Sequence, residues 1–217
     1  MVRPAEGLPV DDWDGGWIDI SRPLTTRTPV WPGEQALALS QHHIGDVLVS
    51  TISTTCHIGT HIDAPLHMCR TGRAVEEIPL ERLIGPAEVV RLPSDVGAAS
   101  PAELPDGWTP RYPRVLLRTD SHPVNAPIGD DFAAASAELV HWLADRGVRT
   151  LGIDTPSVDA FSSTDLAAHH ALIEREMTWI EGLLLDGVET GSFLLIALPM
   201  PLEGCEAAPV RALIRDL

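Results

Sequence analysis

Three histidines and one aspartate lie within eleven residues of this chain, in the segment HIGTHIDAPLH. All four occupy odd-numbered positions: His57, His61, Asp63 and His67. Alternate residues of an extended chain share one face, so an extended backbone turns these side chains to the same side. Neutral imidazole and carboxylate groups are good ligands for zinc, manganese and similar divalent ions, and a carboxylate such as Asp63 can also bridge two ions. We therefore predict a metal site in this segment.

The backbone of the segment must bend if its four polar side chains are to share one site. A straight strand of this length spreads them over about 33 Å, and Gly59 and Pro65 permit a bend. A helix is the alternative, and it would make His57 and His61 neighbours on adjacent turns. Glycine, β-branched residues and proline disfavour that helix. In the zinc-protease motif a glutamate follows the first histidine, whereas here isoleucine follows His57. We therefore reject the helix.

The elements that position this segment are a mixture of strands and helices. β-Branched and alternating apolar runs predict strands at residues 17–20, 47–55, 87–92, 115–118, 150–153, 179–185 and 192–198. Apolar residues at helical spacing predict helices over 132–145 and 165–176. Prolines and glycines mark 93–113 as a long surface loop. The mixture predicts an α/β fold, with more strand early and helices late.

Composition and charge narrow the range of partners. The chain has 217 residues and a formal net charge of −16 at pH 7. This length suits a single domain, residues 17–217, after a flexible N-terminal tail, residues 1–16. So acidic a surface repels phosphate backbones and anionic lipids, and we expect neither nucleic acid nor membrane as a partner. Three cysteines without a CxxC pair, and no signal peptide or apolar span, predict a cytoplasmic protein.

The histidine segment resembles the motif HxGTHxDxPxH of the cyclase-like metal hydrolases, the family that includes bacterial kynurenine formamidase and isatin hydrolase. Four further segments match family landmarks in the expected order: WIDIS, TPVWPG, GIDTPSVD and IALPMPLEGCEAAPVRALI. The resemblance covers residues 17–217. It implies a single α/β domain with a mixed, barrel-like β core and flanking helices, the swivelling β/β/α fold of these hydrolases.

The resemblance also implies which residues hold metal. His57, His61 and Asp63 match metal ligands, with Asp63 bridging two ions per subunit, zinc or alternatively manganese, and His67 matches the acid/base residue. Family members take two further ligands, a histidine and a glutamate twelve residues later, which match His169 and Glu181. A straight helix separates such a pair by about 18 Å. The two residues can therefore share one site only if the helix ends between them, as predicted at residue 176. His170 is the alternative to His169, and Glu181 is alternatively an exposed strand residue.

The reaction follows from the same resemblance. Trp31 matches a tryptophan that lines the substrate pocket of the formamidases, where its face can stack on an aromatic ring, and turn packing is its alternative role. The implied reaction is hydrolysis of N-formyl-L-kynurenine to L-kynurenine and formate in tryptophan degradation. Metal-activated water attacks, with His67 as general acid/base. The alternatives are an isatin hydrolase-like cyclic amide hydrolase, a natural-product cyclase or hydrolase, and a non-catalytic metal-binding protein. Relatives form dimers or tetramers, so we expect a homodimer or homotetramer that acts on a small aromatic amide.

Overall fold

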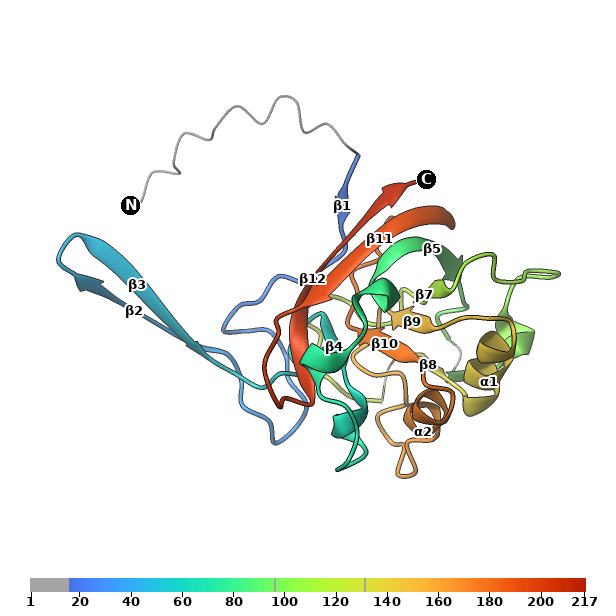
Figure 1. Cartoon of the computed structure of the whole chain (residues 1–217), viewed down its shortest axis with the longest axis horizontal. Helices are drawn as coiled ribbons and strands as arrows, with labels where there is room; N and C mark the ends of the chain where they lie inside the picture. The colour runs from blue at the N-terminus through green and yellow to red at the C-terminus, as the bar shows by residue number, and fades with distance from the viewer. Residues whose placement is uncertain (1–15, 96, 131) are drawn as a thin grey trace.

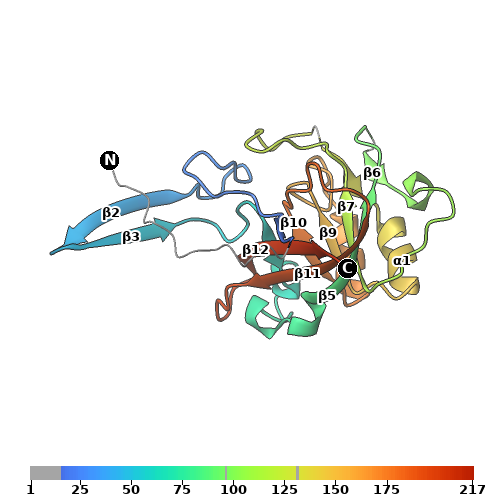
Figure 2. The same ribbon diagram turned by 90° about the horizontal axis from the view of Figure 1, so that it is seen from above.

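The largest feature of the fold is a β-sheet that closes on itself (Figure 1 and Figure 2). The computed structural model describes residues 16–95, 97–130 and 132–217, so the predicted tail, residues 1–16, lies outside them except for Gly16. Seven strands follow one another in the order β12–β11–β5–β7–β9–β10–β4, and β4 pairs again with β12 to form a barrel. These strands are β4 (His61–Asp63), β5 (Ile84–Arg91), β7 (Arg114–Arg118), β9 (Thr150–Ile153), β10 (Thr178–Glu181), β11 (Gly191–Pro199) and β12 (Ala207–Asp216).

The direction of each barrel strand follows from its connection. β5, β7, β9 and β10 are parallel neighbours, and the remaining barrel pairs are antiparallel. Parallel neighbours need a crossover, and helices supply two of them. Helix α1 (Ala137–Asp145) joins β7 to β9, and α2 (Ala167–Glu174) joins β9 to β10. Both helices lie on the same side of the barrel (Figure 1). Short strands complete the fold: β1 (Ile18–Asp19) pairs with β12, and β6 (Ala98–Ala99) pairs with β8 (Ala134–Ala135).

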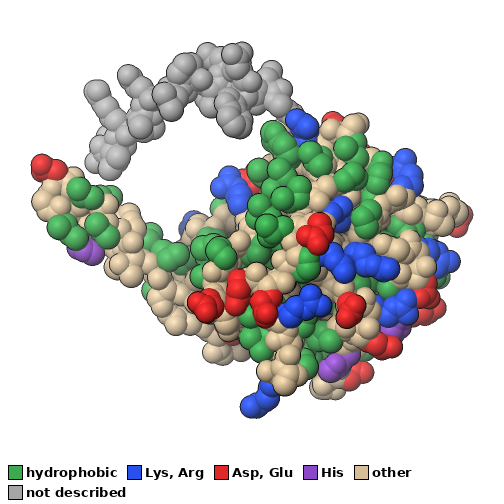
Figure 3. Space-filling model, in the orientation of Figure 1, with side chains coloured by type: hydrophobic (Ala, Val, Ile, Leu, Met, Phe, Trp, Pro, Cys, Tyr) green, Lys and Arg blue, Asp and Glu red, His purple; other side chains and the backbone are tan. Residues whose placement is uncertain are grey.

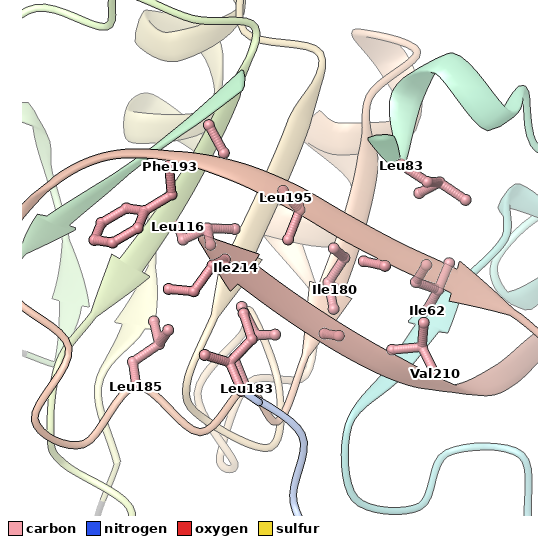
Figure 4. Packing of buried hydrophobic residues seen from close by; sticks show 14 of the residues in the cluster. Ile62, Leu83, Leu116, Ile180, Leu183, Leu185, Phe193, Leu195, Val210 and Ile214 are labelled. Atoms are coloured by element: carbon pink, nitrogen blue, oxygen red, sulfur yellow. The ribbon is translucent and has the colours of Figure 1, made fainter. Parts of the chain in front are cut away.

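Two apolar clusters hold the barrel and its helices together. Successive side chains of a strand point to opposite faces, so Leu116 of β7 packs inside the barrel while Leu117 packs outward beneath the helices. The side chains of β10 alternate in the same way: Ile180 packs inside the barrel and Trp179 packs outside it. Figure 4 shows the inner cluster, to which strands from both halves of the chain contribute. Each fully buried aliphatic side chain contributes about 1.5–3 kcal/mol.

A two-stranded hairpin, β2 (Ala38–Ile44) and β3 (Val47–Ser53), projects far from the barrel (Figure 1 and Figure 2). We call it the arm. Its strands pair with each other in register from Ala38–Ser53 to Ile44–Val47, and they join no other sheet. All but one of its strand residues are exposed. Among the described residues, therefore, none covers either face of the arm.

The predicted α/β class with a barrel-like core is confirmed. Helix α1 begins at residue 137, not at 132, because Ser136 caps it by accepting a hydrogen bond from the Leu139 amide (3.1 Å). The predicted strand 179–185 ends at Glu181, and the loop 93–113 contains β6 and a 3₁₀ helix, Pro101–Glu103. Strands β2, β4, β6, β8 and β12 were not predicted, and β8 lies within the range predicted as a helix. Neither α1 nor α2 is long and apolar enough to cross a membrane, and the described residues contain no other α-helix.

Candidate metal centre and active site

The predicted metal-site residues meet at one end of a cavity of about 360 Å³. They come from separate parts of the chain. His57 lies in the loop after β3, His61 and Asp63 belong to β4, and His67 ends a 3₁₀ helix that follows β4. The other two residues are His169 in the first turn of α2 and Glu181 at the end of β10. The structure thus brings together all six residues, which span 125 positions of the sequence from 57 to 181.

Strand pairing explains how distant residues of the cluster meet. β10 runs antiparallel to β4, so that Glu181 lies opposite His61 and Trp179 lies opposite Asp63. α2 ends at Glu174, and Glu176 takes a left-handed conformation with φ of 50°. The predicted break of the helix before residue 181 is therefore confirmed.

Asp63 is the centre of the cluster. Its Oδ1 lies 2.9 Å from His57 Nδ1 and 3.5 Å from His61 Nε2. Its Oδ2 lies 3.7 Å from His169 Nε2 and accepts a hydrogen bond from the indole Nε1 of Trp179 at 3.2 Å. Asp63 is only 1% exposed, so these neighbours fix a carboxylate that water scarcely reaches.

Further contacts fix the orientation of the other ligand candidates. His61 Nδ1 lies 3.2 Å from the Gly59 carbonyl oxygen, which can only accept, so Nδ1 carries the proton and Nε2 faces the carboxylates. His169 Nδ1 lies 2.7 Å from Asp159 Oδ2, and its Nε2 likewise faces the cluster. Glu181 Oε1 accepts a hydrogen bond from the Val158 amide at 2.8 Å. Such outer contacts are typical of histidine and carboxylate metal ligands.

The donor atoms fit a divalent metal ion. They form two groups, His57–Asp63–His67 and His61–Asp63–Glu181, and within each group the donor atoms lie within 4.8 Å of one another. Asp63 belongs to both groups. His61 Nε2 is buried and has no hydrogen-bond partner among the described residues. A buried nitrogen left in this way is costly unless a cation completes its coordination.

The carboxylates perturb the buried histidines strongly. Burial lowers the pKa of His57, but the hydrogen bond and charge of Asp63 outweigh it and raise the pKa to about 9. Burial likewise opposes the rise for His169, where the hydrogen bond to Asp159 and the nearby carboxylates of Asp63 and Glu181 raise the pKa to about 10. Burial favours protonated Asp63, yet its bonds to His169 and His57 hold its pKa well below the usual range. Without a bound metal, the carboxylates therefore favour protons on the buried histidines, and a divalent ion would have to displace those protons.

His67 differs from the other histidines of the cluster. It is exposed, and its ring centroid lies 4.4 Å from that of His57 and 5.9 Å from that of His169. Burial of part of its ring lowers the pKa of His67, and the charges of His57 and His169 lower it further against the pull of Asp63. Its imidazole is therefore neutral at neutral pH, and it lines the cavity.

Two glycines allow the loops of the site to approach each other. Gly59 and Gly182 have φ of 60° and 64°, in the left-handed region where glycine is favoured. A Cβ on Gly182 would overlap the Gly59 carbonyl oxygen. This close approach brings His57 and His61 against the end of β10.

The rest of the cavity is largely apolar and includes an aromatic pair. Trp31 lies in its wall, with its ring centroid 5.1 Å from that of Phe161 and the planes tilted by 39°. His169 is buried in the cavity wall, while His170 is exposed and does not line the cavity. The structure therefore places His169, not the alternative His170, in the cluster.

Several residues of the site were not singled out from the sequence. Asp159 and Trp179 hold His169 and Asp63, and Phe161 completes the aromatic pair. Arg22 and His122 also line the cavity. Asp159 is the last residue of GIDTPSVD, a segment that matches a family landmark. The sequence did not indicate that Asp159 binds His169.

The comparisons with known proteins agree with this geometry. The sequence profile of the family described as "Putative cyclase" matches residues 18–160. The chain therefore belongs to this family. A curated relative, the kynurenine formamidase of Salinibacter ruber (strain DSM 13855 / M31), is 41% identical over 214 residues, which cover 92% of this chain and 97% of the relative.

Solved structures share the fold. A potential metal-dependent hydrolase with cyclase activity superposes with a TM-score of 0.79 at 28% identity, covering 91% of this chain and 96% of the other. Isatin hydrolase A from Labrenzia aggregata superposes with a TM-score of 0.75 at 24% identity, covering 91% and 92% of the two chains. These matches confirm the predicted family and the barrel fold.

Proposed function

We propose that this chain is a metal-dependent amide hydrolase that converts N-formyl-L-kynurenine to L-kynurenine and formate. The observation that carries the proposal is a histidine–carboxylate cluster, with Asp63 shared by two groups, at one end of a cavity lined by Trp31 and Phe161. Similarity to kynurenine formamidases supports the substrate. We assign residues 17–217 to this one hydrolase unit and, because all three cysteines are free, place it in the cytoplasm.

We assign the metal ligands as His57, His61, Asp63, His169 and Glu181. Asp63 belongs to both donor groups and would be shared by two divalent ions, zinc or alternatively manganese. Bound divalent ions supply Lewis acidity and lower the pKa of water towards neutrality. The outer contacts to Gly59 and Asp159 keep the Nε2 lone pairs of His61 and His169 directed at the cluster.

We assign His67 as the general acid/base. It is the exposed member of the cluster and adjoins His57, so its ring can reach a substrate in the cavity. In the hydrolysis, a C–O bond forms between water and the formyl carbon as the C–N bond breaks. His67 accepts the proton of the attacking water and delivers it to the leaving nitrogen. Trp31 holds the aryl ring by stacking.

The test is an assay of formate release from N-formyl-L-kynurenine, with isatin as the competing substrate. We expect turnover of the formamide with kcat/KM at least tenfold above that for isatin, and loss of turnover with a chelator. Faster opening of isatin would replace the formamidase assignment by a cyclic amide hydrolase. Bound metal without turnover of either compound would leave a metal-binding protein.

We also propose that the chain forms a homodimer or homotetramer through its arm. Five large apolar side chains of the arm are exposed: Leu39, Ile44, Val47, Leu48 and Ile52. Figure 3 shows that apolar side chains gather on the arm. An isolated two-stranded hairpin is marginally stable in water, and exposed apolar patches mark protein contacts. The arm carries one charged residue, Asp46, in a chain of net charge −16. Two copies can therefore meet there with little charge repulsion.

A further inference from the structure

One carboxylate in the cavity wall lies outside the histidine cluster. The amide of Glu34 donates a hydrogen bond to the Trp31 carbonyl at 3.0 Å, which closes a turn, and both residues line the cavity. Its side chain lines the same cavity as the cluster, but Glu34 belongs to neither of the two donor groups. Glu34 Oε2 is buried and has no hydrogen-bond partner among the described residues.

The other two carboxylates of the cavity wall are already engaged. Asp63 accepts from Trp179 and adjoins three histidines, and Glu181 accepts from the Val158 amide. A buried charged oxygen without a partner destabilises a fold, and native proteins tolerate such a group chiefly where a ligand or ion completes it. Glu34 is thus a preformed acceptor in the wall of the cavity that Trp31 and Phe161 also line.

The cavity offers no comparable free cation in the part of the chain that the structure describes. Arg22 is the one arginine in its wall, and the wall contains no lysine. Each nitrogen of the guanidinium has a partner within the protein. Nε donates to the Gly182 carbonyl (3.1 Å), Nη1 contacts His122 Nδ1 (3.2 Å), and Nη2 donates to the carbonyls of His122 (2.9 Å) and Asp154. Glu34 therefore suits a cationic group of the ligand.

We propose that Glu34 determines substrate specificity by binding the α-ammonium group of an amino-acid aryl formamide. The inference rests on the proposed function and adds to it the recognition of the amino-acid end. The formyl group lies at the histidine cluster, the aryl ring lies against Trp31 and Phe161, and the ammonium group donates to Glu34. A charge-assisted hydrogen bond of this kind also separates such substrates from isatin, which has no ammonium group.

The test compares two formamides in the wild type and in Glu34→Gln. N-Formyl-L-kynurenine has the amino-acid end, and N-formyl-2-aminoacetophenone keeps the ring, ketone and formamide but lacks that end. We expect the ratio of kcat/KM between the first and second substrates to fall about 10- to 100-fold in Glu34→Gln, mainly through KM. Glu34→Asp should restore part of the ratio. The exposed Glu203→Gln is the matched control and keeps the wild-type ratio.

An equal loss for both substrates, or an unchanged ratio, would overturn the role of Glu34 while leaving the hydrolase assignment intact. Binding of the two product amines, measured by calorimetry, needs no turnover. It therefore tests Glu34 even if neither formamide is hydrolysed. We expect Glu34→Gln to weaken L-kynurenine binding about 10- to 100-fold relative to 2-aminoacetophenone. Equal weakening of both amines, or none, would again contradict the inference.

Discussion

Replacing Asp159 with asparagine should weaken metal binding although Asp159 is not itself among the assigned ligands. Asp159 is 5% exposed. Its Oδ1 accepts from the Ala168 amide (2.9 Å), and its Oδ2 accepts from the His169 amide (3.0 Å) and from His169 Nδ1 (2.7 Å). These three bonds hold the start of α2 and direct His169 Nε2 towards Asp63 and Glu181. An asparagine amide group replaces one acceptor by a donor, so at least one of the three bonds is lost.

The magnitude follows from these contacts. Loss of an outer hydrogen bond to a metal-bound histidine lowers metal affinity about 10- to 100-fold, which corresponds to about 1.4–2.8 kcal/mol. Asp159 also caps α2, because the helix has Leu166 at its N-cap, which forms no side-chain cap. Loss of a cap costs about 0.5–2 kcal/mol, so the metal-free variant should unfold at a lower urea concentration.

The assay is competition for zinc between the protein and a chromophoric chelator, with urea unfolding of the metal-free protein alongside. Asp165→Asn is the matched control, because Asp165 is exposed and accepts from Ser163 Oγ (3.1 Å) without contacting His169. An Asp159→Asn protein that binds zinc within twofold of the wild type would refute the role of Asp159. An equal loss in Asp165→Asn would show a general effect on the loop.

Three further predictions concern the reaction, the arm and the core. His67→Gln should lower kcat about 10²- to 10⁴-fold with the metal content unchanged, whereas loss of metal on analysis would make His67 a ligand. Leu48→Asp, in the arm, should shift the sedimentation coefficient towards that of a monomer, whereas Leu80→Asp, at an exposed leucine outside the arm, should not. Identical behaviour of the two variants would contradict the arm contact. Leu116→Ala, inside the barrel, should cost about 2–5 kcal/mol in urea unfolding, and a loss below about 0.5 kcal/mol would contradict tight packing there.

Much of the site was predictable because its residues carry a local pattern. His57, His61, Asp63 and His67 lie within eleven residues, and glycine and proline show that the backbone bends there. His169 and Glu181 were reached through the resemblance. Their meeting depends on the β4–β10 register, which pairs residues more than a hundred positions apart and which no local pattern specifies.

The contacts that support the site were harder to predict because they are long-range. In the sequence, Trp179 is an ordinary apolar strand residue. Only the structure shows that its Nε1 donates a hydrogen bond to Asp63 at 3.2 Å. Glu34 becomes notable only when its burial and lack of a partner are known.

The missed strands have a physical explanation too. β12 carries Arg211 and Arg215 among its apolar residues because its outer face is open to solvent, so it lacks a continuous apolar run. The arm strand β2 is exposed along its whole length, and its residues therefore show no buried face to predict.

The central claim is that metal held by this cluster is required for formamide hydrolysis. The most direct measurement titrates zinc or manganese back into chelator-treated protein and follows formate release from N-formyl-L-kynurenine together with bound metal. We predict that activity rises with metal content until the cluster is filled, with one L-kynurenine formed per formate. Formate release at full rate in the metal-free protein, or metal binding that restores no activity, would contradict this account.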